Sequence, residues 1–477
     1  MAIETGSENR SRSPLRPVSA KGGVGEWENP GVSATTTSTE QPIPATTSRA
    51  IIDLGAISHN AAVLARAAGA PWMAVVKADA YGHGLEPVAR ACLDTGATWL
   101  GVAQLAEALH LRSLLDAAGI ARPVPELRSL PTPDAPRILT WLAPVLTPEG
   151  AAAPGSPLRA AIAADLDLSV SALDQARAIA AAADAEGRAA RVHIKADTGM
   201  SRAGATDGEL PALAAALAGA ESAGSLAVVG LWSHLSRADE PDSGSTEDHL
   251  ARFRAADDAV TAAGLAPVVR HLAATGGLLW HPDARLDLVR AGIGLYGLSP
   301  DPSVASSAAL GLRPAMRLEA PLTLVKRIPA GQAVSYGGTW TAPTSRWVGL
   351  VPLGYADGIP RSASGAPVTV LPSPPSAAPG ADDGAVPIHA RIVGRVCMDQ
   401  MVIDLGPAAP AGGPAGEEPP ARAGDTAVLW GDGADPAGIP TADEWAAACG
   451  TINYEIVTRL GARVPRVHLG VGWEDRV

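Results

Sequence analysis

The chain has 477 residues, 47% of them apolar and 4% aromatic, which is enough for two domains or for one large barrel with an appended domain. Its net charge of −12 comes without a basic block, which argues against nucleic acid or an anionic membrane surface as a partner. The three cysteines are too few and too scattered for a disulfide framework or a zinc site. No apolar run approaches the roughly 20 residues of a membrane span, and the first residues lack a signal-peptide core. We therefore expect a cytoplasmic protein.

The first segment, residues 1–48, is rich in Ser, Thr, Pro and Gly and shows no hydrophobic periodicity. Such a composition cannot bury enough apolar surface to order itself, so we predict a disordered tail.

Residues 49–312 alternate short apolar runs with Ala-rich stretches of helical periodicity. The runs predict eight strands at 73–76, 99–102, 137–142, 166–170, 191–194, 226–231, 268–272 and 286–289. The clearest predicted helices lie at 107–115, 173–183, 209–217 and 246–263. Eight strands alternating with helices over about 250 residues are typical of a (β/α)8, TIM-like barrel. An open doubly wound sheet is the alternative, but it would usually have fewer strands and a Gly-x-Gly-x-x-Gly turn after the first.

Residues 313–477 have a β-like pattern, which predicts a second, mostly β domain. Predicted strands lie at 322–328, 347–352, 388–393, 401–405 and 426–429, with one helix at 441–448. Gly-Asp-Gly at 431–433 predicts a hairpin-like turn. Three stretches rich in Pro, Ala and Gly, at 122–135, 372–384 and 407–422, are predicted to be surface insertions.

In a barrel, catalytic groups gather where the strands end. Lys77 follows the first predicted strand, and burial there would favour the neutral amine, which forms Schiff bases with carbonyl groups. The alternative is a lysine whose ammonium group reaches solvent. Thr275, Gly292 and Ile293 belong to turns after strands seven and eight, where barrels often hold a phosphate. A Schiff-base lysine and a phosphate cradle in one mouth imply pyridoxal phosphate (PLP).

Several motifs carry a resemblance to a known family. VVKADAYGHG, KADTGMSRAG, SHLSRADE, RAGIGLYGL, VSYGGTW, GYADGIPR, GRVCMDQ and TINYE resemble, in order, the motifs of the alanine racemase family. The resemblance runs from about Arg49 to the C-terminus, apart from the insertions. It implies a barrel followed by a β domain, and PLP-dependent interconversion of L- and D-alanine that supplies D-alanine for peptidoglycan.

The resemblance also implies roles for single residues. Lys77 and Tyr336 would be the two bases, one on each face of the substrate; because a free tyrosine has a pKa of about 10, Tyr336 would need the support of His234 and Arg290. The cofactor would contact Lys77, Tyr81, His234, Thr275, Arg290, Gly292, Ile293 and Tyr454. Arg202 and Met398 would bind substrate, and Lys195 would be a possible carbamate. The corridor through which substrate enters would contain Asp239, Tyr355, Arg361 and Arg395.

Two of these implications concern chemistry and assembly. An arginine practically never gives up its proton, so Arg290 would leave the pyridine nitrogen unprotonated and suppress transamination. The alternative is that Arg290 pairs with Asp287. Tyr336 belongs to the β domain and would reach the barrel of a second chain, so we expect a homodimer with shared active sites.

The chain departs from the family pattern at three positions. Ala274 replaces a usual asparagine, Ala291 a usual proline, and Trp340 is larger than the residue often found there. These changes leave two other functions open: a PLP racemase of another or broader amino-acid range, and a PLP-binding protein without turnover. A decarboxylase is disfavoured because it would need a carboxylate where Arg290 stands.

Overall fold

A computed structural model describes residues 48–123, 126–372, 386–409 and 418–470. The predicted tail therefore lies outside the described residues except for Ser48, and each predicted insertion lies partly outside them.

The first half of the chain forms a parallel eight-stranded sheet in the order β8-β7-β6-β5-β4-β3-β2-β9. Its strands are β2 (Trp72–Val75), β3 (Trp99–Gln104), β4 (Arg137–Leu142), β5 (Asp167–Val170), β6 (Ala190–Lys195), β7 (Leu226–Trp232), β8 (Val269–His271) and β9 (Val289–Ala291). Two backbone hydrogen bonds join the outer strands: Arg290 N donates to Ala273 O at 3.0 Å, and Asp287 N donates to Arg270 O at 3.1 Å. The sheet is thereby nearly closed, which confirms the TIM-like barrel.

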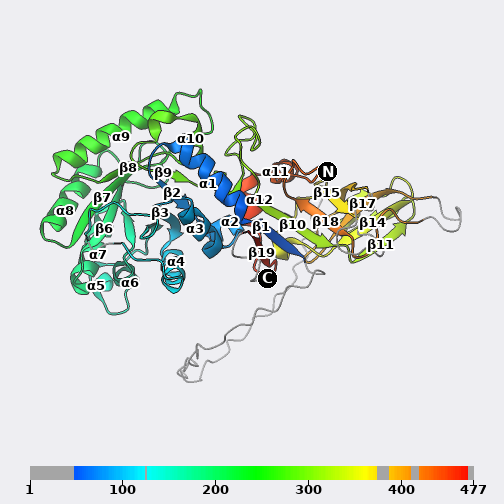
Figure 1. The fold of residues 1–477 in the computed structure, drawn as a ribbon, viewed down its shortest axis with the longest axis horizontal. Helices are drawn as coiled ribbons and strands as arrows, with labels where there is room; N and C mark the ends of the chain where they lie inside the picture. Colours follow the sequence, from blue (N-terminus) through cyan, green and yellow to red (C-terminus); the bar gives the residue numbers. More distant parts are fainter. Residues whose placement is uncertain (1–47, 124–125, 373–385, 410–417, 471–477) are drawn as a thin grey trace, which may run out of the picture. The chain divides into compact units, whose positions relative to one another are not determined.

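Helices surround the barrel strands (Figure 1). They are α1 (Leu54–Ala68), α3 (Leu85–Asp94), α4 (Leu105–Ala117), α5 (Pro148–Ala152), α6 (Pro157–Ala163), α7 (Leu173–Glu186), α8 (Leu210–Ser222), α9 (Ser245–Ala262) and α10 (Thr275–Trp280). Local chemistry sets several of their ends. Asp53 caps α1 by accepting from Ala56 N, and α7 ends where Gly187 adopts a left-handed φ of 66°.

The eighth barrel strand is shifted from its predicted position at 286–289. Leu286 has a φ of +51°, and the Asp287 carboxylate accepts from Arg270 N at 2.9 Å. The apolar run therefore begins in a turn, and the strand starts at Val289 and continues through Arg290. The shift places Arg290 inside the barrel wall.

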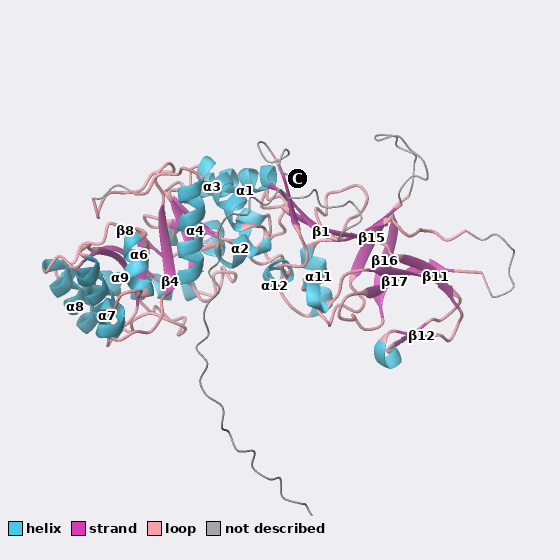
Figure 2. Cartoon of the chain, turned by 90° about the horizontal axis from the view of Figure 1, so that it is seen from below, coloured by secondary structure: helices cyan, strands magenta, loops and turns pink. Residues whose placement is uncertain are grey.

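The second half is a nine-stranded sheet, ordered β11-β14-β17-β16-β15-β18-β10-β1-β19. Its strands are β1 (Arg49–Asp53), β10 (Met316–Pro321), β11 (Leu324–Ile328), β14 (Arg346–Val351), β15 (Pro367–Leu371), β16 (Ile388–Val393), β17 (Met401–Pro407), β18 (Thr426–Trp430) and β19 (Arg466–Leu469). A separate ribbon joins β12 (Ala333–Val334) to β13 (Trp340–Thr341). Figure 2 shows these strands together with α11 (Ala442–Cys449) and α12 (Asn453–Thr458), in agreement with the expected mostly β domain.

Two local features of this half differ from expectation. Strand β1, at the start of the segment predicted to form the barrel, pairs with β10 (Ala50 with Leu318) and with β19, so it belongs to the nine-stranded sheet. The turn at 431–433 is not a hairpin. It lies in the connection from β18 to α11. That helix begins after Thr441, whose hydroxyl caps it by accepting from Glu444 N.

Candidate functional site

Lys77 opens an unusual turn directly after β2. The segment α2 (Lys77–Gly82) contains four consecutive residues, Ala78 to Tyr81, with φ between 51° and 55°. A left-handed turn of residues other than glycine costs roughly 1–2 kcal/mol per residue, so surrounding contacts must hold it.

Contacts from four sides hold the left-handed turn. The Glu107 carboxylate accepts from Ala78 N at 2.6 Å, and the Asp79 carboxylate accepts from Leu85 N at 2.8 Å. His83 is fully buried and contacts the Tyr81 carbonyl through Nδ1 at 2.9 Å. Tyr296 donates to Val75 O at 3.0 Å and stacks on Tyr81 with ring centres 4.6 Å apart. The turn therefore fixes both Lys77 and Tyr81.

A cavity of about 390 Å³ lies at this turn. Nine residues predicted from the sequence line it: Lys77, Tyr81, Arg202, His234, Asp239, Thr275, Gly292, Ile293 and Tyr454. Tyr454 comes from α12, so a helix of the β half completes a cavity at the barrel mouth. Ala274, the residue that departs from the family pattern, also lines it.

One wall of the cavity gathers polar groups around Thr275. The Thr275 hydroxyl is buried and accepts from Gly292 N at 2.9 Å. A Cβ at Gly292 would lie 3.0 Å from the Tyr81 hydroxyl, so glycine permits the close approach of the two turns. Burial raises the pKa of both Tyr81 and Tyr454, which keeps their hydroxyls as hydrogen-bond donors. This wall suits an anion such as a phosphate.

Amines and cations lie at this cavity and next to it. Burial lowers the pKa of Lys77, Arg202 lowers it further, and Glu107 partly opposes both. Burial, Arg290 and Arg202 lower the pKa of Lys195 to about 8. The Lys195 ammonium lies 4.2 Å from the ring centre of Trp232. Both lysines are thus shifted toward the neutral amine, the form that reacts with carbonyl groups and with CO2.

Arg290 is buried and contacts His234, which lines the cavity. Its Nη2 contacts His234 Nδ1 at 3.0 Å and donates to the carbonyls of Ser233 and Leu272. Burial lowers the pKa of Arg290 to about 9, which leaves it charged at neutral pH. The alternative pairing with Asp287 is not observed: Asp287 accepts a hydrogen bond from Arg270 N and forms an ion pair with the Arg270 side chain at 3.9 Å.

The remaining predicted residues lie on an exposed face of the β half. Tyr336 is 72% exposed and Met398 is 53% exposed, and Arg395 and Tyr355 are exposed as well. Ser335 Oγ donates to Arg395 O at 2.6 Å, and Tyr355 N donates to Cys397 O at 3.0 Å, so these four lie close together. Arg361 is exposed too, without a described contact to this group. None of the five lines the Lys77 cavity.

Three contributors to the site were missed from the sequence. Glu107 and Tyr296 fix the turn that carries Lys77, and His271 contacts Arg290 Nη1 through Nδ1 at 3.1 Å. For Glu107 a signal was available: it stands three residues after Gln104, the spacing of a capping box.

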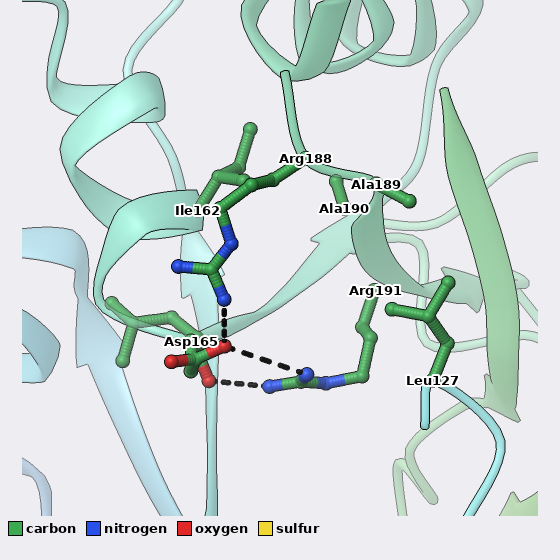
Figure 3. Close-up of a pocket in the computed structure, with 8 residues that line it drawn as sticks. Leu127, Ile162, Asp165, Arg188, Ala189, Ala190 and Arg191 are labelled. Atoms are coloured by element: carbon green, nitrogen blue, oxygen red, sulfur yellow. Dashed lines mark hydrogen bonds and ion pairs between the residues drawn. The ribbon is translucent and has the colours of Figure 1, made fainter. Parts of the chain in front are cut away.

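A smaller cavity of about 230 Å³ lies at the opposite end of β6 from Lys195. Figure 3 shows Arg188 and Arg191 directed at Asp165 there, and Arg188 pairs with that carboxylate at 2.5 Å. These charges pair with one another at the barrel end away from Lys77, which suits a structural role. Among the described residues, no helix is both long and apolar enough to cross a membrane, and no cluster of His, Cys, Asp and Glu could hold a metal.

Comparison with known proteins places this geometry in a family. The model of the alanine racemase N-terminal domain matches residues 52–300, and that of the C-terminal domain matches residues 315–468. An alanine racemase of Beutenbergia cavernae is 50% identical, with 88% of this chain and 98% of the relative covered. One of Frankia casuarinae is 48% identical, with 87% of this chain and 95% of the relative covered.

Solved structures agree with the sequence matches. The alanine racemase of Streptomyces coelicolor A3(2) superposes with a TM-score of 0.75 at 45% identity, covering 89% of this chain and 98% of that one. That of Bacillus anthracis, solved with bound L-Ala-P, gives a TM-score of 0.71 at 30% identity, covering 91% and 97%. The chain therefore belongs to the alanine racemase family, whose members are isomerases.

Proposed function

We propose that the chain binds PLP through Lys77 and interconverts L- and D-alanine with Lys77 and Tyr336 as the two bases. The observation that carries the proposal is one cavity holding both a partly buried amine of lowered pKa and an anion cradle. PLP has an aldehyde and a phosphate, so the residues present fit it. Lys77 would hold the aldehyde, and Thr275, Tyr81, Tyr454 and the Gly292 and Ile293 backbone would hold the phosphate.

Bound PLP would attach to the substrate amine through its aldehyde and would accept the electron pair released when the α-proton leaves. The chain's own residues must then move protons. Displaced from the aldehyde, the Lys77 amine is neutral enough to accept the α-proton on one face, because burial and Arg202 favour its uncharged form. A group on the opposite face must return a proton to the same carbon.

We assign the role of that second group to Tyr336. A single chain leaves it 72% exposed, and it lies on a face with Arg395, Met398 and Tyr355. A second copy of the chain that presents this face to the Lys77 cavity would supply the missing base. We therefore include a homodimer with shared sites in the proposal.

Arg290 and His234 would prepare the cavity for this phenol. A guanidinium has donors only, so His234 Nδ1 must accept from Arg290, and the proton of the neutral ring lies on Nε2. Burial and Arg290 hold the pKa of His234 well below its usual value, which keeps the ring neutral. Nε2 is then the atom that can donate to a phenolic oxygen.

Arg202 supports recognition of the substrate carboxylate, because it lines the cavity close enough to Lys77 and Lys195 to lower the pKa of both. A carbamate on Lys195 would turn a neighbouring cation into an anion and orient Arg202. Binding of L-Ala-P by the Bacillus anthracis relative supports a ligand the size of alanine. Supply of D-alanine for peptidoglycan belongs to the same proposal, as does a cytoplasmic location, where thiols such as the free Cys397 stay reduced.

Mixing two inactive variants tests the shared site. Tyr336→Phe should keep the visible absorbance of lysine-bound PLP and lose about 10²- to 10⁴-fold in racemisation, more in the L-to-D direction. Lys77→Ala should lose the absorbance and the activity. Co-expressed, they should recover about a quarter of the wild-type activity, because half of randomly paired dimers are mixed and each has one intact site.

Each outcome separates one alternative. No recovery in the mixed dimers would place both bases within one chain or discard Tyr336. Wild-type protein that binds PLP without turning over any amino acid would be a PLP-binding protein. Faster turnover of serine or a larger amino acid than of alanine would favour a racemase of broader range. Ala274, which lines the cavity, is the residue that supports this alternative.

A further inference from the structure

A continuous series of buried polar side chains crosses the barrel interior. Asp167 on β5 contacts His193 Nε2 on β6 at 3.2 Å. His193 Nδ1 contacts His271 Nε2 on β8 at 3.0 Å, and His271 Nδ1 contacts Arg290 Nη1 on β9 at 3.1 Å. Asp167, His193 and His271 are fully buried, and Arg290 is 3% exposed. We call these four residues the barrel relay.

Hydrogen-bonding capacity fixes every proton in the barrel relay. Arg290 can only donate, so His271 Nδ1 must accept and the proton of that ring must lie on Nε2. His271 Nε2 then donates to His193 Nδ1, which leaves the His193 proton on Nε2, directed at Asp167. Burial lowers the pKa of both histidines, in agreement with two neutral rings. Every donor in the series points away from Arg290 and toward Asp167.

The barrel is built around these rings. A Cβ at Gly230 would lie 2.0 Å from His193 Nδ1, so only glycine leaves room for the His193–His271 contact. The pairing of β6 with β7 also slips by one residue between Val192 and His193. Trp99 meets the His193 ring edge-on at 5.2 Å, and Trp232 stacks on His271 with an angle of 5° between the planes. Neither imidazole can turn without displacing a neighbour.

Asp167 is the fixed end of the series. Arg191 Nε donates to it at 2.5 Å, and Arg137 lies 3.8 Å away. Burial alone would raise the pKa of Asp167, but Arg191, the hydrogen bond from His193 and Arg137 hold it below its usual value. Arg191 is itself held by the Asp165 carbonyl at 2.5 Å, in the cluster shown in Figure 3.

Arg290 is the end of the barrel relay that contacts His234, a residue of the Lys77 cavity. Its described contacts are to neutral groups, namely His271, His234, the carbonyls of Ser233 and Leu272, and the Trp232 ring, whose centre lies 5.0 Å from Arg290 Cζ. The hydrogen bonds of the described residues connect Arg290 to the carboxylate of Asp167 through two imidazoles. If His271 turned or moved its proton to Nδ1, a donor would face a donor and Arg290 Nη1 would lose this acceptor.

We propose that Asp167 and His193 are positioning residues for Arg290: they hold His271 in the one tautomer that accepts from the guanidinium, and so help to fix the cation that holds His234 at the Lys77 cavity. The tautomer follows from the contacts alone, whereas the effect on cofactor rests on the proposed function. Residues up to four strands away from Arg290 would then determine how well the pocket holds PLP.

The test compares three variants by two measurements. His193→Leu removes both hydrogen bonds, and His193→Gln keeps an acceptor and a donor. Thr140→Val is the control, because it removes a buried hydrogen bond to Ala103 O in the barrel wall outside the relay. Nitrogen NMR of histidine-labelled protein without cofactor reports which nitrogen of His271 carries the proton. Fluorescence titration with PLP reports cofactor affinity.

In wild type and in T140V, His271 should carry its proton on Nε2. H193L should show mixed tautomers of His271 and an affinity for PLP weaker by about tenfold or more, since a charged donor loses its fixed partner. H193Q should recover most of that loss. A proton on His271 Nδ1 in the unmodified protein overturns the proposal even if H193L fails to fold. So does an H193L affinity equal to that of T140V. Failure of the wild type to racemise alanine would instead overturn the proposed function and leave the tautomer result standing.

Discussion

The barrel mouth and the exposed face of the β half present chemical groups in opposite ways. At the mouth, Lys77, Tyr81 and Thr275 are held by buried contacts within one chain, and their surroundings shift the pKa of Lys77 and Tyr81. On the β face, Tyr336 and Met398 point into solvent, 72% and 53% exposed. The difference teaches that one chain completes the Lys77 cavity by itself, whereas Tyr336, the second base of the proposed function, would reach such a cavity only in a second copy of the chain.

The largest expected effect distinguishes loss of the cofactor's attachment point from loss of the positive charge of any lysine. Lys77→Ala should lower racemase activity by at least about 10³-fold, since it removes both the attachment point and one base. Lys326→Ala, which removes an exposed lysine of the β half, should leave activity within twofold of wild type. Steady-state racemisation and the visible spectrum check both. Equal losses in the two variants would contradict the assignment of Lys77.

A glycine pair tests the contact between the turn that carries Lys77 and helix α12. Gly82 has a φ of +79°, and a Cβ there would lie 2.5 Å from Val457 O. Gly82→Ala should lower the free energy of unfolding by about 2–4 kcal/mol, from left-handed strain plus the clash. Gly69→Ala is the control, with a φ of +61° and no atom within 4 Å, and should cost only about 1 kcal/mol. Urea unfolding measures both free energies. Similar losses in the two variants would mean that α12 does not pack closely against the turn.

The phosphate cradle should respond to loss of one hydroxyl. Thr275→Ala leaves Gly292 N without its acceptor and should weaken PLP binding by about tenfold. Thr275→Ser keeps the hydroxyl and should bind within about threefold of wild type. Fluorescence titration of the protein without cofactor measures both. If Thr275→Ser bound PLP as weakly as Thr275→Ala, packing of the threonine methyl group rather than hydrogen bonding would explain the contribution of Thr275 to PLP binding.

The exposed face should affect turnover without affecting the cofactor. Arg395→Ala should leave PLP affinity unchanged, because Arg395 does not line the Lys77 cavity. We expect kcat/KM for alanine to fall by up to about tenfold, as a charge near the substrate route is lost. A weakened PLP affinity in this variant would instead place Arg395 in the cofactor pocket.

The smallest expected effect concerns pH and Lys195. Only the neutral amine reacts with CO2, forming a carbamate and releasing a proton. Because the pKa of Lys195 is lowered to about 8 from 10.5, the neutral fraction should rise through pH 8 rather than near 10.5. Carbon NMR with labelled CO2 should therefore show the carbamate increasing about threefold or more from pH 7 to 8 at constant dissolved CO2, and no signal in Lys195→Ala. A signal that rises only above pH 9 would contradict the shift.

The order of elements and the position of Lys77 after the first barrel strand were readable from the sequence. Apolar runs and helical periodicity depend on neighbours a few residues apart, so they predicted the alternating strands and helices of the barrel. The motif around Lys77 likewise lies within ten consecutive residues. Local pattern failed where a strand's partner decides its place: β1 joins the β sheet because β10 and β19 pair with it, and the eighth strand starts only after the left-handed turn at Leu286.

The tertiary structure decided what surrounds each group. Alternation of Arg191, His193 and Lys195 along β6 places polar residues on one face of a strand, but nothing in that spacing shows that His193 meets His271, 78 residues later. The same holds for the left-handed turn, which Glu107 and Tyr296 hold from distant elements. Sequence alone determines which side chains a strand presents. Which donor meets which acceptor, and therefore which pKa is shifted and which proton is fixed, depends on closure of the barrel, because only closure brings strands distant along the chain within hydrogen-bond distance.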